Sequence, residues 1–176
     1  MTDDESVSKQ NRGPAAAASN RRALIRAARE LFAEQGFGVP FSAIARRAGV
    51  GQASLYRHFP DKVSLGIAVF DENLQGLEGR PLGLREFLDA IAGQARVSAS
   101  LLEALVSAQS PHAIELDVRL RALITGILDR ENLGPRVTVD DIATAVSMVA
   151  FHTASSPAHD AAERAIAIVE RGLLPR

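Results

Sequence analysis

The chain has 176 residues, a formal net charge of −1 and a hydrophobic content of 47%. This length allows one domain with a sizeable core or two smaller domains. Cysteine is absent, which excludes a disulfide framework and a thiolate metal site. No apolar run approaches the roughly 18 residues of a membrane span, and the acidic start MTDDESVSKQ is unlike a signal peptide. We therefore expect a soluble cytoplasmic protein without a membrane partner.

The net charge conceals an asymmetry along the chain. The segment 9–62 holds ten basic and three acidic residues, whereas the residues after it include ten basic and fifteen acidic ones. A basic module joined to an acidic one indicates that the first part meets a polyanion such as nucleic acid.

The first predicted elements are a tail and three helices. Residues 1–18 lack apolar periodicity and predict a disordered tail. Apolar residues at positions 24, 27, 28, 31 and 32 then have the spacing of an amphipathic helix, which should end at Gly36. A second helix is predicted from about Phe41 to Gly49, with Pro40 at its first position. After the turn GVG, the string QASLYRHF predicts a third helix that Pro60 stops.

The remaining elements are also predicted to be helices. Asp61 can cap a fourth helix that runs toward Leu77. Beyond Leu82 the periodic segments have helical spacing and none alternates as a strand does; they cover 84–94, 97–107, 111–133, 139–154 and 157–172. We expect an all-α chain with a helix-turn-helix domain at 19–65 and a helical bundle at 66–176.

The second and third predicted helices carry the pattern that points to function. Two short helices joined by a glycine-containing turn can place the second helix in a DNA major groove. On the third predicted helix, which would enter the groove, Arg57 offers a planar fork for guanine or phosphate, and Gln52 can pair with adenine. Lys62 and the first N–H groups of the fourth helix would add a positive end for a phosphate. The side chains that can donate to phosphate oxygens are Ser54, Tyr56 and His58. These residues predict binding of double-stranded DNA, and the arginines at positions 21, 22, 26 and 29 are secondary candidates for phosphate or minor-groove contact.

The string FSAIARRAGVGQASLYRHFPDKVSL, preceded by ALIRAARELFAEQGF, resembles the DNA-binding domain of the TetR family of bacterial transcriptional regulators. The family's first helix reads like AA-x-x-LF-x-x-x-GF, its second like IA-x-x-AGV, and its third like LYxHF followed by a lysine. All three motifs are present in order, over roughly Arg22 to Leu65, about a quarter of the chain.

The resemblance implies a homodimeric, ligand-responsive repressor that binds a palindromic operator. It implies that the last two helices pair with their copies, which the alanine-rich faces in 143–154 and 161–169 permit. Carried over by position, the DNA-contacting residues are Ser42, Arg46, Gln52, Ala53, Ser54, Tyr56, Arg57, His58 and Lys62. One departure is that the family often caps the second helix with a hydroxyl residue, where this chain has Val39-Pro40-Phe41. A second departure from the family pattern is that the C-terminal domain is short.

Three other kinds of site are considered next: a ligand cavity, a catalytic pair and a metal site. Residues that would line a ligand cavity in the second domain are His112, Arg119, Met148, Phe151 and His152. Ser54 and His58 stand four apart, but no carboxylate is supplied to orient the imidazole, so we expect no enzyme. The histidine spacing matches no metal pattern, and we expect no metal and no cofactor.

Two rival functions remain. The first is a DNA-binding regulator without a small-molecule ligand, against which an apolar pocket of several hundred Å³ would count. The second is a helical enzyme or interaction module, which a lack of salt-sensitive DNA binding would favour.

Overall fold

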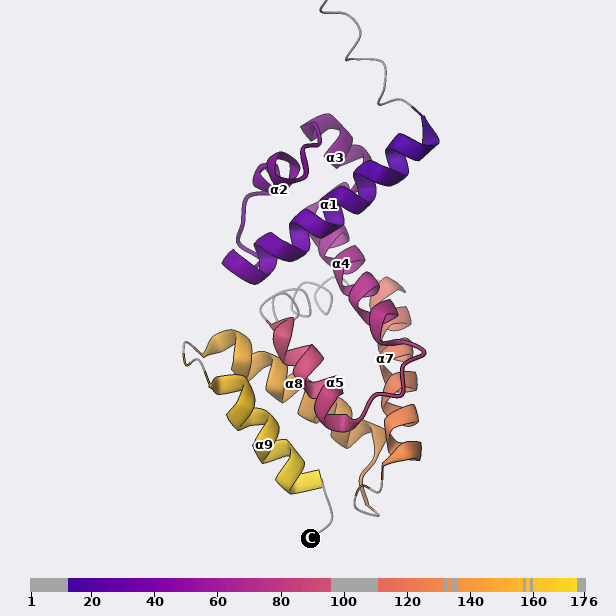
Figure 1. The fold of residues 1–176 in the computed structure, drawn as a ribbon, viewed down its shortest axis with the longest axis vertical. Coiled ribbons are helices and arrows are strands. Elements are labelled where there is room, and N and C mark those ends of the chain that lie inside the picture. Colours follow the sequence, from indigo (N-terminus) through magenta and orange to yellow (C-terminus); the bar gives the residue numbers. More distant parts are fainter. Residues whose placement is uncertain are drawn as a thin grey trace, which may run out of the picture. The chain divides into compact units, whose positions relative to one another are not determined.

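The structure, a computed structural model, describes residues 13–95, 111–131, 133, 136–156, 158 and 160–173. Within these ranges the chain forms helices joined by turns and short irregular segments, and no residue lies in a strand. The chain divides into two compact units, the first ending at Val69 and the second beginning at Phe70 (Figure 1). The predicted all-α class is confirmed.

Helix α1 (Pro14–Gln35) begins earlier than the sequence predicts. Residues 14–18 of the expected tail are helical because proline suits the first helical position and the alanines after it have the highest helix propensity. The prediction of a disordered tail reaching residue 18 is corrected accordingly, and residues 1–12 lie outside the described ranges. The helix ends at Gly36, whose φ is 74° and whose N–H donates to the carbonyl of Phe32.

Helices α2 (Phe41–Ala48) and α3 (Gln52–His58) follow as predicted. Between them, Gly49 has a left-handed backbone with φ 66° and ψ 27°, a conformation that suits glycine because it has no Cβ. Both helices pack with α1 around one apolar core. Its largest buried side chains are Leu24, Ile25, Leu31, Phe32, Ile44, Leu55 and Phe59. This core decides which face of α3 remains in solvent.

Helix α4 (Lys62–Leu77) contains the division between the two units. Asp61 caps its start, as predicted, because its Oδ1 accepts the N–H of Ser64 at 2.7 Å. The Ser64 hydroxyl donates in turn to the Asp61 carbonyl at 2.8 Å. In the first unit, Leu65 and Val69 anchor α4 through fully buried side chains.

The second unit contains α5 (Leu84–Gly93), α7 (Pro111–Arg130), α8 (Val139–Ser155) and α9 (Ala161–Leu173). These helices correspond to the predicted segments 84–94, 111–133, 139–154 and 157–172, whereas the predicted helix 97–107 lies outside the described ranges. Helix α8 starts with a capping box, in which the Thr138 hydroxyl accepts from the Asp141 N–H and Asp141 accepts from the Thr138 N–H.

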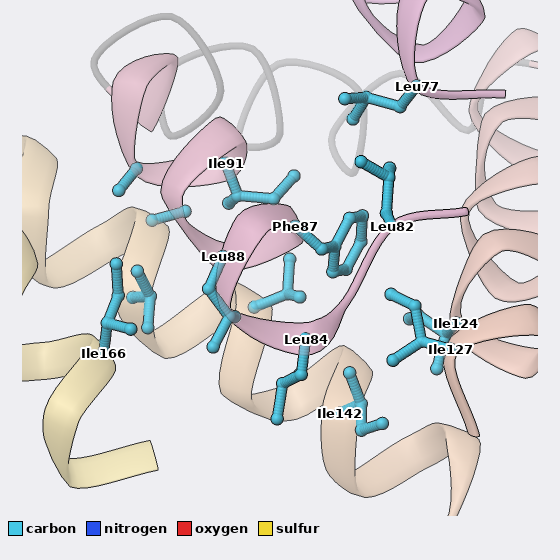
Figure 2. Close-up of a cluster of buried hydrophobic side chains, with 14 of the residues drawn as sticks. Leu77, Leu82, Leu84, Phe87, Leu88, Ile91, Ile124, Ile127, Ile142 and Ile166 are labelled. Carbon is cyan, nitrogen blue, oxygen red and sulfur yellow. The ribbon is translucent and has the colours of Figure 1, made fainter. Parts of the chain in front are cut away.

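A cluster of buried apolar side chains holds the second unit together. Figure 2 shows Phe87 of α5 facing Ile124 and Ile127 of α7, with Ile142 of α8 and Ile166 of α9 in the same cluster. Because Phe87 and Ile124 are completely buried, side chains fill this part of the unit.

Candidate nucleic-acid interface

The exposed side of α3 follows from its two apolar anchors. Leu55 is fully buried, and Phe59, which follows the helix, is 2% exposed. Since residues four apart lie on one face of a helix, this pair fixes the rotation of α3 on the core. The predicted DNA-contacting side chains of Gln52, Ala53, Tyr56 and Arg57 are exposed, whereas those of Ser54 and His58 are half-buried at the edge of the same surface.

Tyr56 is the most distinctive side chain of this surface. It is 57% exposed although it carries a large ring, and its hydroxyl has no hydrogen-bond partner among the residues that the structure describes. Its ring makes an edge-to-face contact with Phe41 at the start of α2, with centroids 5.3 Å apart and planes at 80°. The ring is therefore held at its side while the hydroxyl remains available.

The two arginines of α2 differ in their surroundings. Arg46 is exposed, and its guanidinium has no ion-pair partner within the described ranges. Arg47 instead reaches α1, where it pairs with Glu34 at 3.1 Å and with Glu30 at 3.3 Å. Its hydrogen bond with Glu34 raises the pKa of Arg47 and lowers that of Glu34. Arg46 is thus free for a polyanion, whereas Arg47 fastens α2 to α1. The sequence analysis does not predict this role of Arg47. Two glutamates one helical turn apart, Glu30 and Glu34, are the pattern that could have indicated an ion pair with it.

Lys62, which the sequence predicts as a phosphate contact, also makes contacts within the first unit. Its Nζ donates to the carbonyls of Phe37 and Val39, both at 2.9 Å, and lies 5.4 Å from the centre of the Phe37 ring. These contacts join the start of α4 to the segment before α2. Lys62 therefore holds the helix-turn-helix in shape, and two of its three donors are already used.

Three of the four arginines of α1 are exposed, whereas Arg29 is half-buried. Arg21, Arg22 and Arg26 are exposed, and the Arg21 guanidinium lies 5.1 Å from the centre of the Phe59 ring, within the range of a cation–π contact. Ser42, in the first turn of α2, is also exposed. The exposed arginines described in the first unit therefore come from α1, α2 and α3 together.

The residues predicted to line a ligand cavity lie on α7 and α8, and four of the five are exposed. Met148 and Phe151 are 62% and 68% exposed, and His112 and His152 are exposed as well. Arg119 is half-buried, but its guanidinium pairs with Asp71 of α4 and with Glu78 just after that helix, which raises its pKa. These contacts link α7 to the part of α4 that belongs to the second unit.

An open hollow of about 360 Å³ lies elsewhere in the second unit. Its walls come from the turn between α4 and α5 and from α7. The lining residues are Gly79, Arg80, Pro81, Ala122, Leu123, Gly126 and Arg130. None of the five predicted ligand-binding residues is among them.

The described ranges also bear on metal binding and on membrane spanning. No three histidine, aspartate or glutamate side chains there are grouped so that they would hold a metal ion. In the same ranges, no helix has the length and apolar character needed to cross a membrane.

The geometry agrees with comparisons to known proteins. Residues 24–69 match the family model of the bacterial regulatory proteins, tetR family. A TetR transcription regulatory protein from Mycobacterium vanbaalenii is similar over 92% of this chain and 98% of its own, with 28% identity and a TM-score of 0.60. A TetR transcriptional regulator from Streptomyces coelicolor is similar over 88% of this chain and 98% of its own, with 25% identity and a TM-score of 0.58.

A third similar structure is the TetR family protein CprB from Streptomyces coelicolor A3(2), with 25% identity, a TM-score of 0.52 and 90% of each chain covered. Both the motif-bearing segment and the arrangement of the remaining helices thus agree with one family. Residues 24–69 thus match the helix-turn-helix DNA-binding domain of the TetR family, and the chain as a whole is similar to solved TetR-family transcriptional regulators.

Proposed function

We propose that the chain is a homodimeric repressor that binds a palindromic operator through α3 of each protomer. The observation that carries this proposal is the orientation of α3, which buries Leu55 and leaves Gln52, Tyr56 and Arg57 in solvent. An exposed helix face with these groups suits a major groove, because the groove admits one helix and presents hydrogen-bonding base edges. Binding to DNA places the protein in the cytoplasm, at the nucleoid.

The proposed roles follow from side-chain chemistry. Arg57 reads a guanine or holds a phosphate, Gln52 pairs with an adenine, and Ala53 packs against a thymine methyl group. The phosphate contacts come from Ser42, Arg46, Ser54, Tyr56 and His58. Lys62 contributes mainly by holding the backbone of the segment before α2.

The proposed dimer uses an apolar surface on α8 and α9. Met148, Phe151 and Ile168 are each more than 60% exposed, although they are large apolar side chains. Met148 and Phe151 lie three residues apart and therefore on one side of α8. The predicted contacts at Val146, Val149 and Ala150 belong instead to the core of the same protomer. The dimer contact thus involves the side of α8 that faces away from that core.

The response to a small molecule has two candidate forms. An effector that binds the second domain is supported by the hollow beside α7, which is large enough for a small organic molecule. Regulation without an effector is favoured by the packing between α5, α7 and α8, where Phe87, Leu88 and Ile124 are completely buried. Thermal-shift screening of the full chain against small organic acids and apolar metabolites separates them, since only the first predicts stabilisation by a bound compound.

The DNA-binding proposal is tested by selecting ligands from random duplexes about 30 bp long, enough for two half-sites one helical turn apart. We expect enrichment of an inverted repeat that binds more weakly as salt rises. Arg57→Ala should lose affinity for the selected duplex, and Arg121→Ala, which changes a half-buried arginine of the acidic second unit, serves as the control. Failure to enrich any sequence, or equal losses in both variants, would contradict the proposal.

A further inference from the structure

The start of α2 is unusual in what its first residue does. The residue before the helix is Pro40, whose backbone is extended and which offers no side-chain cap to the free N–H groups. Phe41, the first residue of the helix, is half-buried and has an apolar side chain that cannot donate to a phosphate. Its described contact is with α3, where its ring meets that of Tyr56 edge to face.

This contact acts on a side chain that is largely exposed. Tyr56 is 57% exposed, and its neighbour Leu55, rather than Tyr56 itself, anchors α3 in the core. An exposed tyrosine samples several staggered χ1 positions, so its hydroxyl is spread over a wide region of space. An aromatic edge at one side removes some of these positions, and a donor that is already placed loses less conformational freedom when it binds.

We propose that Phe41 is a positioning residue that holds the Tyr56 ring so that its hydroxyl meets a DNA phosphate. The proposal rests on the DNA binding proposed above and deepens it. Phe41 itself needs no contact with DNA in this arrangement. Its contribution depends on an aromatic ring whose centroid lies 5.3 Å from that of Tyr56 and whose plane is nearly perpendicular to it, which an aliphatic side chain of similar volume does not provide.

The test uses the full chain and a duplex obtained by the selection described above. Phe41→Leu keeps an apolar side chain but removes the ring edge, and Tyr56→Phe keeps the second ring but removes the hydroxyl. We expect Phe41→Leu to weaken binding by about 10-fold, since an edge-to-face pair is worth a few-fold per copy and a dimer carries two copies. In the Tyr56→Phe background, Phe41→Leu should cause little further loss, because the hydroxyl that it positions is gone. Phe41→Tyr keeps an aromatic ring at this position, so it should retain the DNA binding that Phe41→Leu loses.

Phe37→Leu is the matched control. Phe37 is also a half-buried phenylalanine of the first unit, but its ring contacts Phe32 and not Tyr56. Any loss of binding in Phe37→Leu should be equal in the Tyr56 and Tyr56→Phe backgrounds. A second readout is the slope of log K against log salt, which should be unchanged by Phe41→Leu and by Tyr56→Phe, because a neutral hydroxyl displaces no counterion.

Each outcome decides between the positioning role and a general structural one. Equal losses from Phe41→Leu in both backgrounds, or unchanged binding, would overturn the positioning role. A reduced salt slope in Phe41→Leu would also overturn it, since the lost contact would then involve a charge. If the selection enriches no duplex, the proposed function fails and this inference fails with it, whereas enrichment with equal losses removes the inference alone.

Discussion

At the scale of single residues, the basic side chains of the first unit separate into two groups. Some, such as Arg46 and Arg57, extend into solvent, while Arg47 and Lys62 make contacts within the unit. Positive charge alone therefore does not identify a DNA contact. Substitutions in the two groups should have different effects, because loss of a phosphate contact changes binding and loss of an internal contact changes stability.

Lys62→Met should mainly destabilise the first unit. The substitution keeps most of the aliphatic length but leaves the carbonyls of Phe37 and Val39 without their donor. We expect a loss of about 2 kcal/mol in the free energy of unfolding, since hydrogen bonds from a charged group are stronger than neutral ones. Urea unfolding followed by circular dichroism measures it. Unchanged unfolding together with a lower salt slope of DNA binding would show that Lys62 is instead a phosphate contact.

Arg46→Ala and Arg47→Ala should have contrasting effects on the salt dependence of binding. Arg46 is proposed to neutralise a phosphate, so its loss from both protomers should reduce the slope of log K against log salt by about 2. Arg47 is already paired with Glu30 and Glu34, so its loss should leave the slope nearly unchanged. Fluorescence anisotropy over a salt series gives both slopes. A larger change for Arg47→Ala would reverse the assignment.

At the scale of elements, the start of α8 is the best-defined helix terminus of the second unit. The Thr138 hydroxyl and N–H both donate to Asp141, and these bonds lower the pKa of the Asp141 carboxyl below its usual value of 3.8. Asp140 also lies in the first turn, where a negative charge interacts favourably with the helix dipole. The capping box thus fixes where α8 begins.

Thr138→Ala should destabilise the chain by about 1 kcal/mol, because it removes the oxygen that accepts the Asp141 N–H. The contribution of ionised Asp141 should depend on pH. Since its pKa is lowered on folding, the contribution is fully present at pH values well above 3.8 and is lost as the pH falls through the lowered value. Comparing the urea unfolding of wild type and Asp141→Asn at pH 7 and at pH 3 checks this. A difference that grows on acidification would contradict the sign.

At the scale of the whole molecule, the proposed regulation depends on how two protomers would meet. The exposed apolar side chains of α8 and α9 supply a surface that a second copy would remove from water. A dimer also sets the spacing of its two α3 helices, and this spacing selects the separation of the operator half-sites.

Phe151→Glu should convert the proposed dimer into a monomer, because it places a charge at the centre of an apolar contact. Light scattering after size-exclusion chromatography measures the mass in solution. Ile114→Glu is the matched control, since Ile114 is also 68% exposed but lies on α7. A dimer that survives Phe151→Glu, or that is lost equally in both variants, would refute the proposed interface. The monomer should also bind the operator more weakly, because one half-site no longer assists the other.

The sequence alone predicted the described helices in their order, the resemblance to the TetR family and the outward face of α3. This was possible because the signals are local: Gly49 and Pro60 mark the ends of short helices, and Leu55 and Phe59 fix the rotation of α3. In Pro14–Ala18, the absence of apolar periodicity was misleading, since alanine propensity and proline at the first turn sufficed for a helix.

Only the folded chain shows which partners are contacted by Phe41, Arg47, Lys62 and Arg119. Each depends on a partner on another helix or in a distant turn, as in the 25 residues that separate Lys62 from Phe37, and a single sequence does not reveal such pairings. The same holds for Met148 and Phe151. Helix α8 carries apolar side chains around most of its circumference, so its pattern leaves the rotation open. The packing of Ile142, Val146 and Val149 against the other helices of the second unit is what turns Met148 and Phe151 outward.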